Sequence, residues 1–139
     1  MKRYRSETGS EVIERLFRER ANLVTTSAIS FAETLGALTR AHRTGLLGQH
    51  ELEDAINGLY TDFASGRIEW LEITHHHLMR CASLIVNYHL TANDALILAT
   101  ALELQPHAPV FVCADVRSGL LRAAEACGLS TLNPLSPVL

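Results

Sequence analysis

Three carboxylates occupy positions from which an acidic side chain could take part in chemistry. Glu33 follows a short apolar stretch, Asp94 opens a very apolar segment, and Asp115 directly follows the apolar run of residues 110–114. Carboxylates that are brought close together repel one another unless a cation lies between them. Donor sets made only of oxygen suit Mg²⁺ or Mn²⁺ better than Zn²⁺. The three acids are therefore candidate ligands of a hard divalent metal ion.

Each of these acids also has a purely structural explanation as a helix cap. Ser30 and Glu33 have the spacing of a capping box, and Thr91 and Asp94 repeat that spacing with a shorter acid. Asp115 is of a residue type that is preferred at the N-cap position. A capping role explains each acid alone, whereas three acids at one edge of a sheet favour a metal site.

Hydrophobic spacing predicts the elements that must position the acids. Strands are expected at residues 23–26, 68–73, 110–114 and 129–132. Helices are expected at residues 12–17, 30–43, 52–63, 78–88 and 93–104, and after residue 120. The segment 93–104 is apolar nearly all round, which predicts a buried helix, and the run 110–114 predicts a strand covered on both faces. The alternation predicts an α/β fold with a parallel sheet between helices, whose site lies beyond the carboxyl ends of the strands.

Length and composition limit the possible classes of protein. The 139 residues predict one domain, 1–139, and 47% hydrophobic residues with 19% charged residues are enough for a core. A net charge of −3 excludes binding to nucleic acid through net charge alone. No apolar stretch predicts a membrane span or a secretory signal, so we expect a cytoplasmic protein whose three cysteines are reduced.

Several stretches together resemble a PIN domain, and within that family the VapC-type ribonuclease toxins. They are the segments 26–33 (TSAISFAE), 93–101 (NDALILATA) and 111–115 (FVCAD), followed by Gly128-Leu129 and Asn133-Pro134. The resemblance runs over nearly the whole chain, and its most specific part is the Asp-Ala-Leu helix. It implies a three-layer α/β/α fold with a central parallel sheet of about four strands flanked by helices.

The resemblance implies a metal-dependent endoribonuclease that uses Mg²⁺ or Mn²⁺. Glu33, Asp94 and Asp115 would be both its catalytic residues and its metal ligands. It further implies that the protein is the toxin of a type II toxin–antitoxin pair, with a small antitoxin protein as partner and often a homodimeric state. The apolar residues of the 52–63 helix are candidates for the contact between two copies.

The chain departs from the PIN pattern at its N-terminus. The family has a first strand that ends in Asp-Thr/Ser-Ser-Ala and supplies one site acid, and here Met1-Lys2-Arg3-Tyr4 resembles the stretch after that strand. One hypothesis is a start codon placed too far downstream, and the other is a true truncation that no longer cuts RNA. An alternative function is therefore a non-catalytic PIN-like module that binds an antitoxin or RNA.

Several basic residues are candidates for contact with RNA phosphates. Arg117 lies two residues after Asp115, and Arg3 and Arg5 cluster at the N-terminus. The run His75–His77 is not expected to bind a metal, because consecutive side chains point in different directions, and we interpret it as a solvated helix start. No phosphate-binding glycine loop and no GxSxG motif is present, which argues against a nucleotide-binding enzyme and an esterase.

Overall fold

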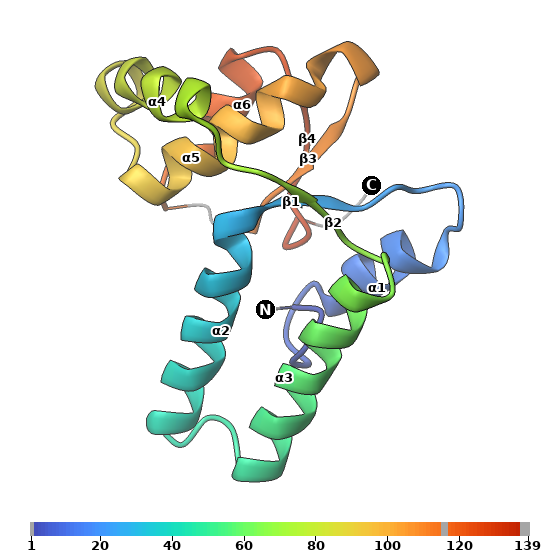
Figure 1. Ribbon diagram of the computed structural model, residues 1–139. Helices are drawn as coiled ribbons and strands as arrows, with labels where there is room; N and C mark the ends of the chain where they lie inside the picture. The colour runs from blue at the N-terminus through green and yellow to red at the C-terminus, as the bar shows by residue number, and fades with distance from the viewer. Residues whose placement is uncertain (1, 115–116, 137–139) are drawn as a thin grey trace. The chain divides into compact units, whose positions relative to one another are not determined.

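The computed structural model describes residues 2–114 and 117–136, in which helices and short strands alternate (Figure 1). The α-helices are α1 (Ser10–Arg18), α2 (Ala28–Arg43), α3 (Gln49–Ala64), α4 (His75–Tyr88), α5 (Ala92–Ala101) and α6 (Leu120–Ala126). The remaining elements are the strands β1 (Thr25–Ser27), β2 (Glu69–Leu71), β3 (Val110–Val112) and β4 (Ser130–Leu132), and the 3₁₀ helix η1 (Leu102–His107). The expected α/β fold class is confirmed.

The strands of the described residues form two hydrogen-bonded pairs. β1 pairs with β2, and β3 pairs with β4 in parallel, with Val110 opposite Ser130 and Val112 opposite Leu132. The parallel pairing agrees with the sequence analysis. The sequence predicts one sheet of about four strands, whereas the described strands are three residues long and pair only two by two. Among the described residues, each strand therefore has its backbone hydrogen bonds to the other strand of its own pair.

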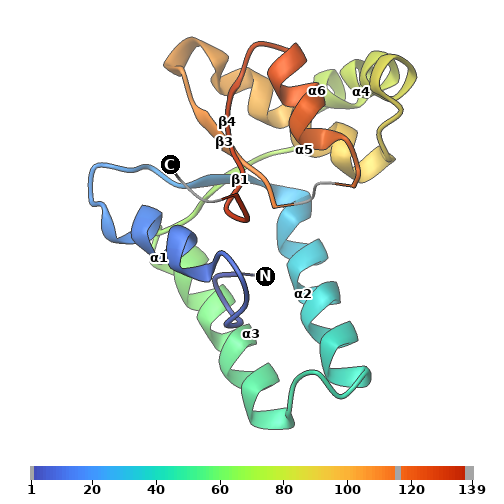
Figure 2. The same ribbon diagram turned by 180° about the vertical axis from the view of Figure 1, so that it is seen from behind.

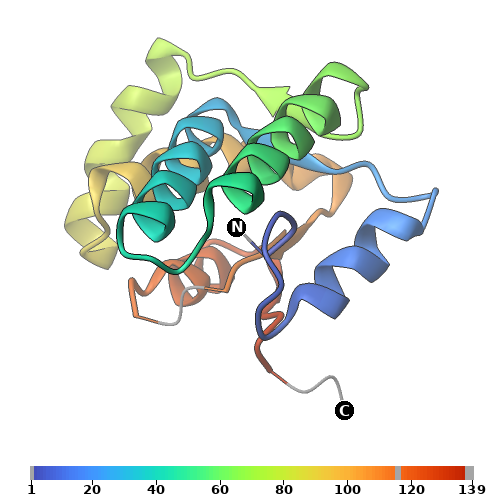
Figure 3. The same cartoon turned by 90° about the horizontal axis from the view of Figure 1, so that it is seen from below.

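The chain forms two compact units, Met1–Trp70 and Leu71–Leu139, and each is described by itself. In the first unit, α2 and α3 form a helical hairpin and lie side by side (Figure 3). Leu38 and Ala41 of α2 pack with Leu47 and with Ala55 of α3, and all four are buried. The hairpin turns at Gly45, whose φ of 73° lies in the left-handed region that glycine adopts without strain.

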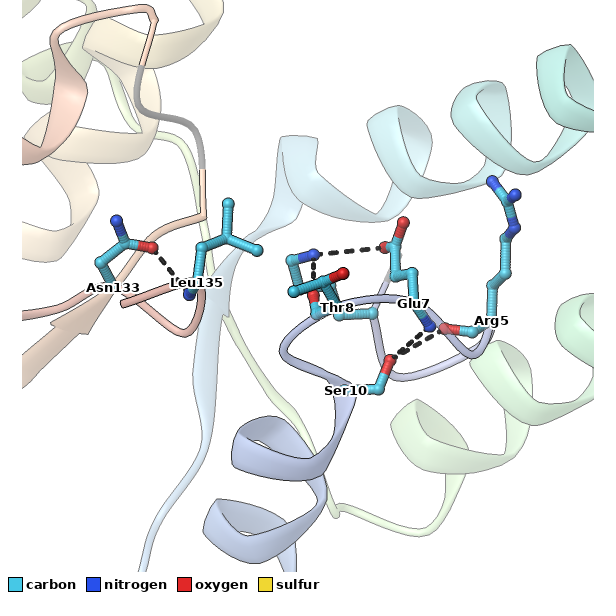
Figure 4. Close-up of polar contacts among 7 residues, drawn as sticks. Arg5, Glu7, Thr8, Ser10, Asn133 and Leu135 are labelled. Atoms are coloured by element: carbon cyan, nitrogen blue, oxygen red, sulfur yellow. Dashed lines mark hydrogen bonds and ion pairs between the residues drawn. The ribbon is translucent and has the colours of Figure 1, made fainter. Parts of the chain in front are cut away.

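Local hydrogen bonds hold the N-terminal segment of the first unit in a turn (Figure 4). The Ser10 hydroxyl donates to the Arg5 carbonyl oxygen over 3.1 Å and accepts the Glu7 N–H over 3.0 Å. The Lys2 ammonium group donates to the Thr8 carbonyl oxygen and lies 3.8 Å from a Glu7 carboxylate oxygen. These contacts fix the turn that leads into α1.

Four aromatic rings form a second cluster in the first unit. Phe31 of α2 contacts Tyr60, Phe63 and Trp70 at centroid distances of 5.3, 5.4 and 5.3 Å, and Phe63 lies 4.2 Å from Trp70. The edge-to-face pairs have a favourable arrangement of ring quadrupoles. Tyr60 and Trp70 nevertheless keep 54% and 47% of their surface exposed, so the cluster is only partly a core.

The second unit has a core built around α5, with α4 and α6 packed against that helix (Figure 2). Ala95, Leu98 and Ala99 of α5 are 0% exposed, which confirms the prediction of a buried helix. The helix is followed directly by the 3₁₀ helix η1, which contains Pro106, a residue that does not fit the interior of an α-helix. No helix of the described segments is long and apolar enough to cross a lipid bilayer.

One expectation about β3 is wrong. The apolar run at residues 110–114 predicts a strand covered on both faces, but Val110 is 58% and Val112 is 38% exposed. Phe111 between them packs against the core of the second unit. Side chains alternate along a strand, so one face of β3 is covered and the other is not.

Candidate active site

Glu33 lies inside α2, in its second turn, and is partly buried. The helix begins at Ala28, directly after β1, with Ser27 at the N-cap position. The capping box predicted from Ser30 and Glu33 is therefore wrong, because both residues lie within the helix and not at its start. Helix capping therefore does not explain an acid at this position.

Asp94 lies in the first turn of α5, and here the predicted cap is confirmed. The Thr91 hydroxyl accepts the backbone N–H of Asp94 over 3.2 Å and donates to the Asp94 Oδ2 over 2.8 Å. The carboxylate is thus held at the positive end of the helix dipole, where negative charge is stabilised. A capping contact does not exclude metal binding, since carboxylates that bind metals are commonly oriented by such a hydrogen bond.

The third predicted acid, Asp115, lies outside the described residues. Of the other two, Glu33 belongs to the first unit and Asp94 to the second. Within residues 2–114 and 117–136, no three acids, histidines or cysteines are grouped as a metal site would require. The chemistry of the predicted donor set, carboxylate oxygen alone, still suits a hard divalent cation.

Arg3, a predicted RNA contact, makes a bidentate ion pair. Its guanidinium donates to Asp62 from Nε over 3.0 Å and from the terminal nitrogen over 3.2 Å, and it lies 4.3 Å from the centre of the Phe17 ring. The Asp62 side chain is only 7% exposed, so Arg3 neutralises a buried charge. Burial, together with the Asp62 charge, raises the pKa of the neighbouring Tyr4 phenol. Arg3 therefore anchors the N-terminal segment to α3.

The other two predicted RNA contacts lie in different units. Arg5 is partly buried beside a cleft of about 670 Å³, and Arg117 is exposed shortly before α6. The cleft carries Arg3 and Arg5 but also the acids Glu51 and Asp54. Its mixed charge does not resemble the continuous basic surface of proteins that bind RNA through phosphates alone.

The histidine run contains a structural residue that the sequence did not indicate. His75 and His76 are exposed at the start of α4, as expected for a solvated helix start, but His77 is 0% exposed. Its Nδ1 accepts the Thr74 N–H over 2.9 Å, and its Nε2 lies 2.8 Å from a Glu103 carboxylate oxygen. The expectation of three solvated histidines is wrong for His77, which caps α4 from inside the unit.

Two residues with hydroxyl groups at helix starts were not among the site residues predicted from the sequence. Thr91 orients the Asp94 carboxylate. The Thr-x-x-Asp spacing in the sequence indicated a helix cap, but it did not indicate that Thr91 orients a candidate metal ligand. Ser27 is 3% exposed at the start of α2, and its only signal was its place between a short strand and the Glu33 helix.

Comparison with protein-family models gives a match over most of the chain. The family model described as PIN domain matches residues 3–126, which is most of the chain. The matched range includes Glu33, Asp94 and Asp115. None of the curated proteins with which the chain was compared matches it. Because the family model matches most of the chain, the chain belongs to the PIN-domain family, a family of nucleases.

Proposed function

We propose that the protein is a metal-dependent endoribonuclease that hydrolyses phosphodiester bonds of RNA. The observation that carries this proposal is the Asp94 carboxylate, held at the first turn of α5 by Thr91 in a chain of the PIN family. PIN nucleases typically use a divalent metal ion. Glu33, inside α2 and without a capping role, supports the same assignment.

Asp94, Asp115 and Glu33 would hold Mg²⁺ or Mn²⁺ in this proposal. The bound ion supplies charge stabilisation at the phosphate and lowers the pKa of a water molecule. The Thr91 hydroxyl fixes the rotamer of Asp94 by donating to Oδ2. Glu33 or Asp115 would accept a proton from the attacking water and so orient it for in-line attack.

The resemblance to VapC-type toxins of the PIN family also suggests which partners the protein binds. We propose that the protein is the toxin of a type II toxin–antitoxin pair, binds a small antitoxin protein and forms a homodimer. An exposed apolar face of α4 supports a protein contact in the second unit, since Met79 is 64% and Val86 is 70% exposed. The mass of the purified protein in solution tests the homodimer, and the mass of a single chain would contradict it.

The RNA contacts proposed are Arg117 and Arg5, with Arg3 in a supporting position. Arg117 is exposed, and Arg5 lies beside the cleft of the first unit. The ion pair of Arg3 with Asp62 holds the segment that carries Arg5. Arginines that contact phosphates position the RNA without reading its sequence.

Cleavage of a labelled structured RNA with Mg²⁺ or Mn²⁺ tests the catalytic assignment. We expect Asp94→Asn and Glu33→Gln each to lower the cleavage rate by about 100-fold or more, because each removes one negative charge from the cation site. Asp94→Asn keeps an oxygen that accepts from Thr91, so its thermal unfolding should stay close to that of the wild type.

The matched control is Glu53→Gln, which removes an exposed acid of α3 outside the proposed site. This variant should cut RNA like the wild type, and chelation of the metal should stop both. Full activity of Asp94→Asn would overturn the assignment. A folded wild type that binds RNA but does not cut it would instead support the non-catalytic PIN-like module.

A further inference from the structure

The aromatic cluster of the first unit exposes two of its four rings to solvent. Tyr60 and Trp70 are 54% and 47% exposed, and each ring centroid lies 5.3 Å from that of Phe31. Phe31 and Phe63 are less exposed and support the two rings, since Phe63 also lies 4.2 Å from Trp70. Rings that are already held by packing lose little side-chain freedom when a ligand binds to them.

The two exposed rings differ in kind from the other exposed apolar side chains. Apart from Tyr60 and Trp70, the large apolar side chains that are exposed among the described residues are leucines, valines, an isoleucine and a methionine. Several of these lie together on α4, and such an aliphatic face suits contact with another protein. The aromatic cluster instead offers flat π-faces, which match the flat face of a nucleobase.

The surroundings of Trp70 are compatible with an approaching RNA chain. Side chains alternate along a strand, so Glu69 and Trp70 of β2 point to opposite faces, and the acid does not share the face of the ring. Arg67 is exposed, and it makes no ion pair within the part of the chain that the structure describes. It lies at most about 11 Å from Trp70 along the chain. Its guanidinium is therefore available to a phosphate of the same RNA segment.

We propose that Tyr60 and Trp70 bind unpaired bases of the RNA by stacking. The identity of the ligand rests on the proposed function, in which the substrate is RNA. A base inside a double helix is stacked between its neighbours, so these rings select single-stranded segments. Phe31 and Glu33 are about 200° apart around α2 and about 3 Å apart along its axis. The stacked bases therefore lie on another side of α2 from the Glu33 carboxylate, and they position the RNA without taking part in cleavage.

The fluorescence of Trp70, the only tryptophan of the chain, tests this inference without requiring cleavage. The full chain is titrated in metal-free buffer with a short single-stranded oligoribonucleotide, and stacking of a base on Trp70 should quench the emission. The control is an abasic oligonucleotide of the same length, which has the phosphates but no bases and should leave the emission nearly unchanged. Equal quenching by both oligonucleotides, or no quenching by the one with bases, would overturn the inference.

Variants of the two rings test the affinity with a labelled oligonucleotide. Tyr60→Leu and Trp70→Leu should each weaken binding of the oligonucleotide with bases about fivefold or more. Binding of the abasic oligonucleotide should not change, which excludes damage to the fold as the cause. Tyr60→Phe keeps a ring and should bind like the wild type, as should Val86→Ala, which shortens an exposed side chain of α4.

Unchanged affinity in both leucine variants would overturn the inference. A fall in their mass in solution would then assign the aromatic cluster to a contact between copies of the chain.

Failure of this inference and failure of the proposed function give different results. RNA cleavage by the wild type without base-dependent quenching of Trp70 would refute the stacking site and leave the nuclease intact. Base-dependent quenching without cleavage under any metal condition would leave the stacking site intact and refute the nuclease.

Discussion

The helices that carry the two described acids begin in opposite ways. α5 begins with Thr91, whose hydroxyl bonds both the backbone and the side chain of Asp94. α2 begins with Ser27, whose hydroxyl bonds nothing among the described residues, and Glu33 lies more than a turn further on. The acid of α5 therefore stabilises its own helix, whereas the acid of α2 does not cap its helix. A site acid can thus be part of the local fold or independent of it, and the two cases respond differently to substitution.

The start of α4 extends this comparison and should give the largest effect on stability. There the capping group is the His77 ring, which is 0% exposed and contacts Thr74 and Glu103. His77→Ala removes the cap and leaves a cavity, so we expect unfolding to become easier by about 2–4 kcal/mol. Chemical denaturation followed by far-UV circular dichroism measures this difference.

The control for this prediction is His76→Ala. His76 is exposed in the same turn of α4, so its removal should change the free energy of unfolding by less than about 0.5 kcal/mol. Equal effects of the two substitutions would mean that His77 does not cap α4 from inside the unit.

Thr91→Ala should have an intermediate effect on stability and a separate effect on catalysis. The lost N-cap should lower the free energy of unfolding by about 1 kcal/mol. Because the same hydroxyl orients Asp94, RNA cleavage should fall about tenfold at saturating metal. Thr91→Ser, which keeps the hydroxyl, should restore most of the free energy of unfolding and most of the RNA cleavage rate. A variant that loses stability but keeps full activity would separate the cap from the proposed site.

Ser30→Ala should have the smallest effect, and this sharpens the comparison of α5 with α2. Ser30 has the sequence spacing of a cap but lies inside α2. Its replacement should leave the free energy of unfolding unchanged or raise it by about 0.5 kcal/mol, since alanine favours helix interiors. A loss of about 1 kcal/mol in thermal or chemical unfolding would instead restore Ser30 as the cap.

Much of the fold could be predicted from the sequence because hydrophobic spacing is a local signal. The buried helix α5 followed from Ala95, Leu98 and their neighbours, and every predicted helix and strand has a counterpart in the described residues. The exposure of Val110 and Val112 could not be predicted, since an apolar strand gives no information about what covers each face.

The candidate site was predictable only in part. The spacing of Thr91 and Asp94 identified a real cap, whereas the same spacing at Ser30 and Glu33 did not. The difference depends on β1, which ends where α2 begins, and a boundary shift of two residues changes the role of every residue in the first turn. The contact of His77 with Glu103 joins residues that lie far apart in the chain, and no local pattern shows it.

The aromatic cluster of the first unit has a practical consequence for measuring stability. The chain has a single tryptophan, Trp70, which is half-exposed and packs against Phe31 and Phe63 of the same unit. Its fluorescence therefore reports the unfolding of residues 1–70, whereas far-UV circular dichroism reports the helices of both units. Coincident transitions in the two signals would show that residues 1–70 and 71–139 unfold as one cooperative body, and separate transitions would show two.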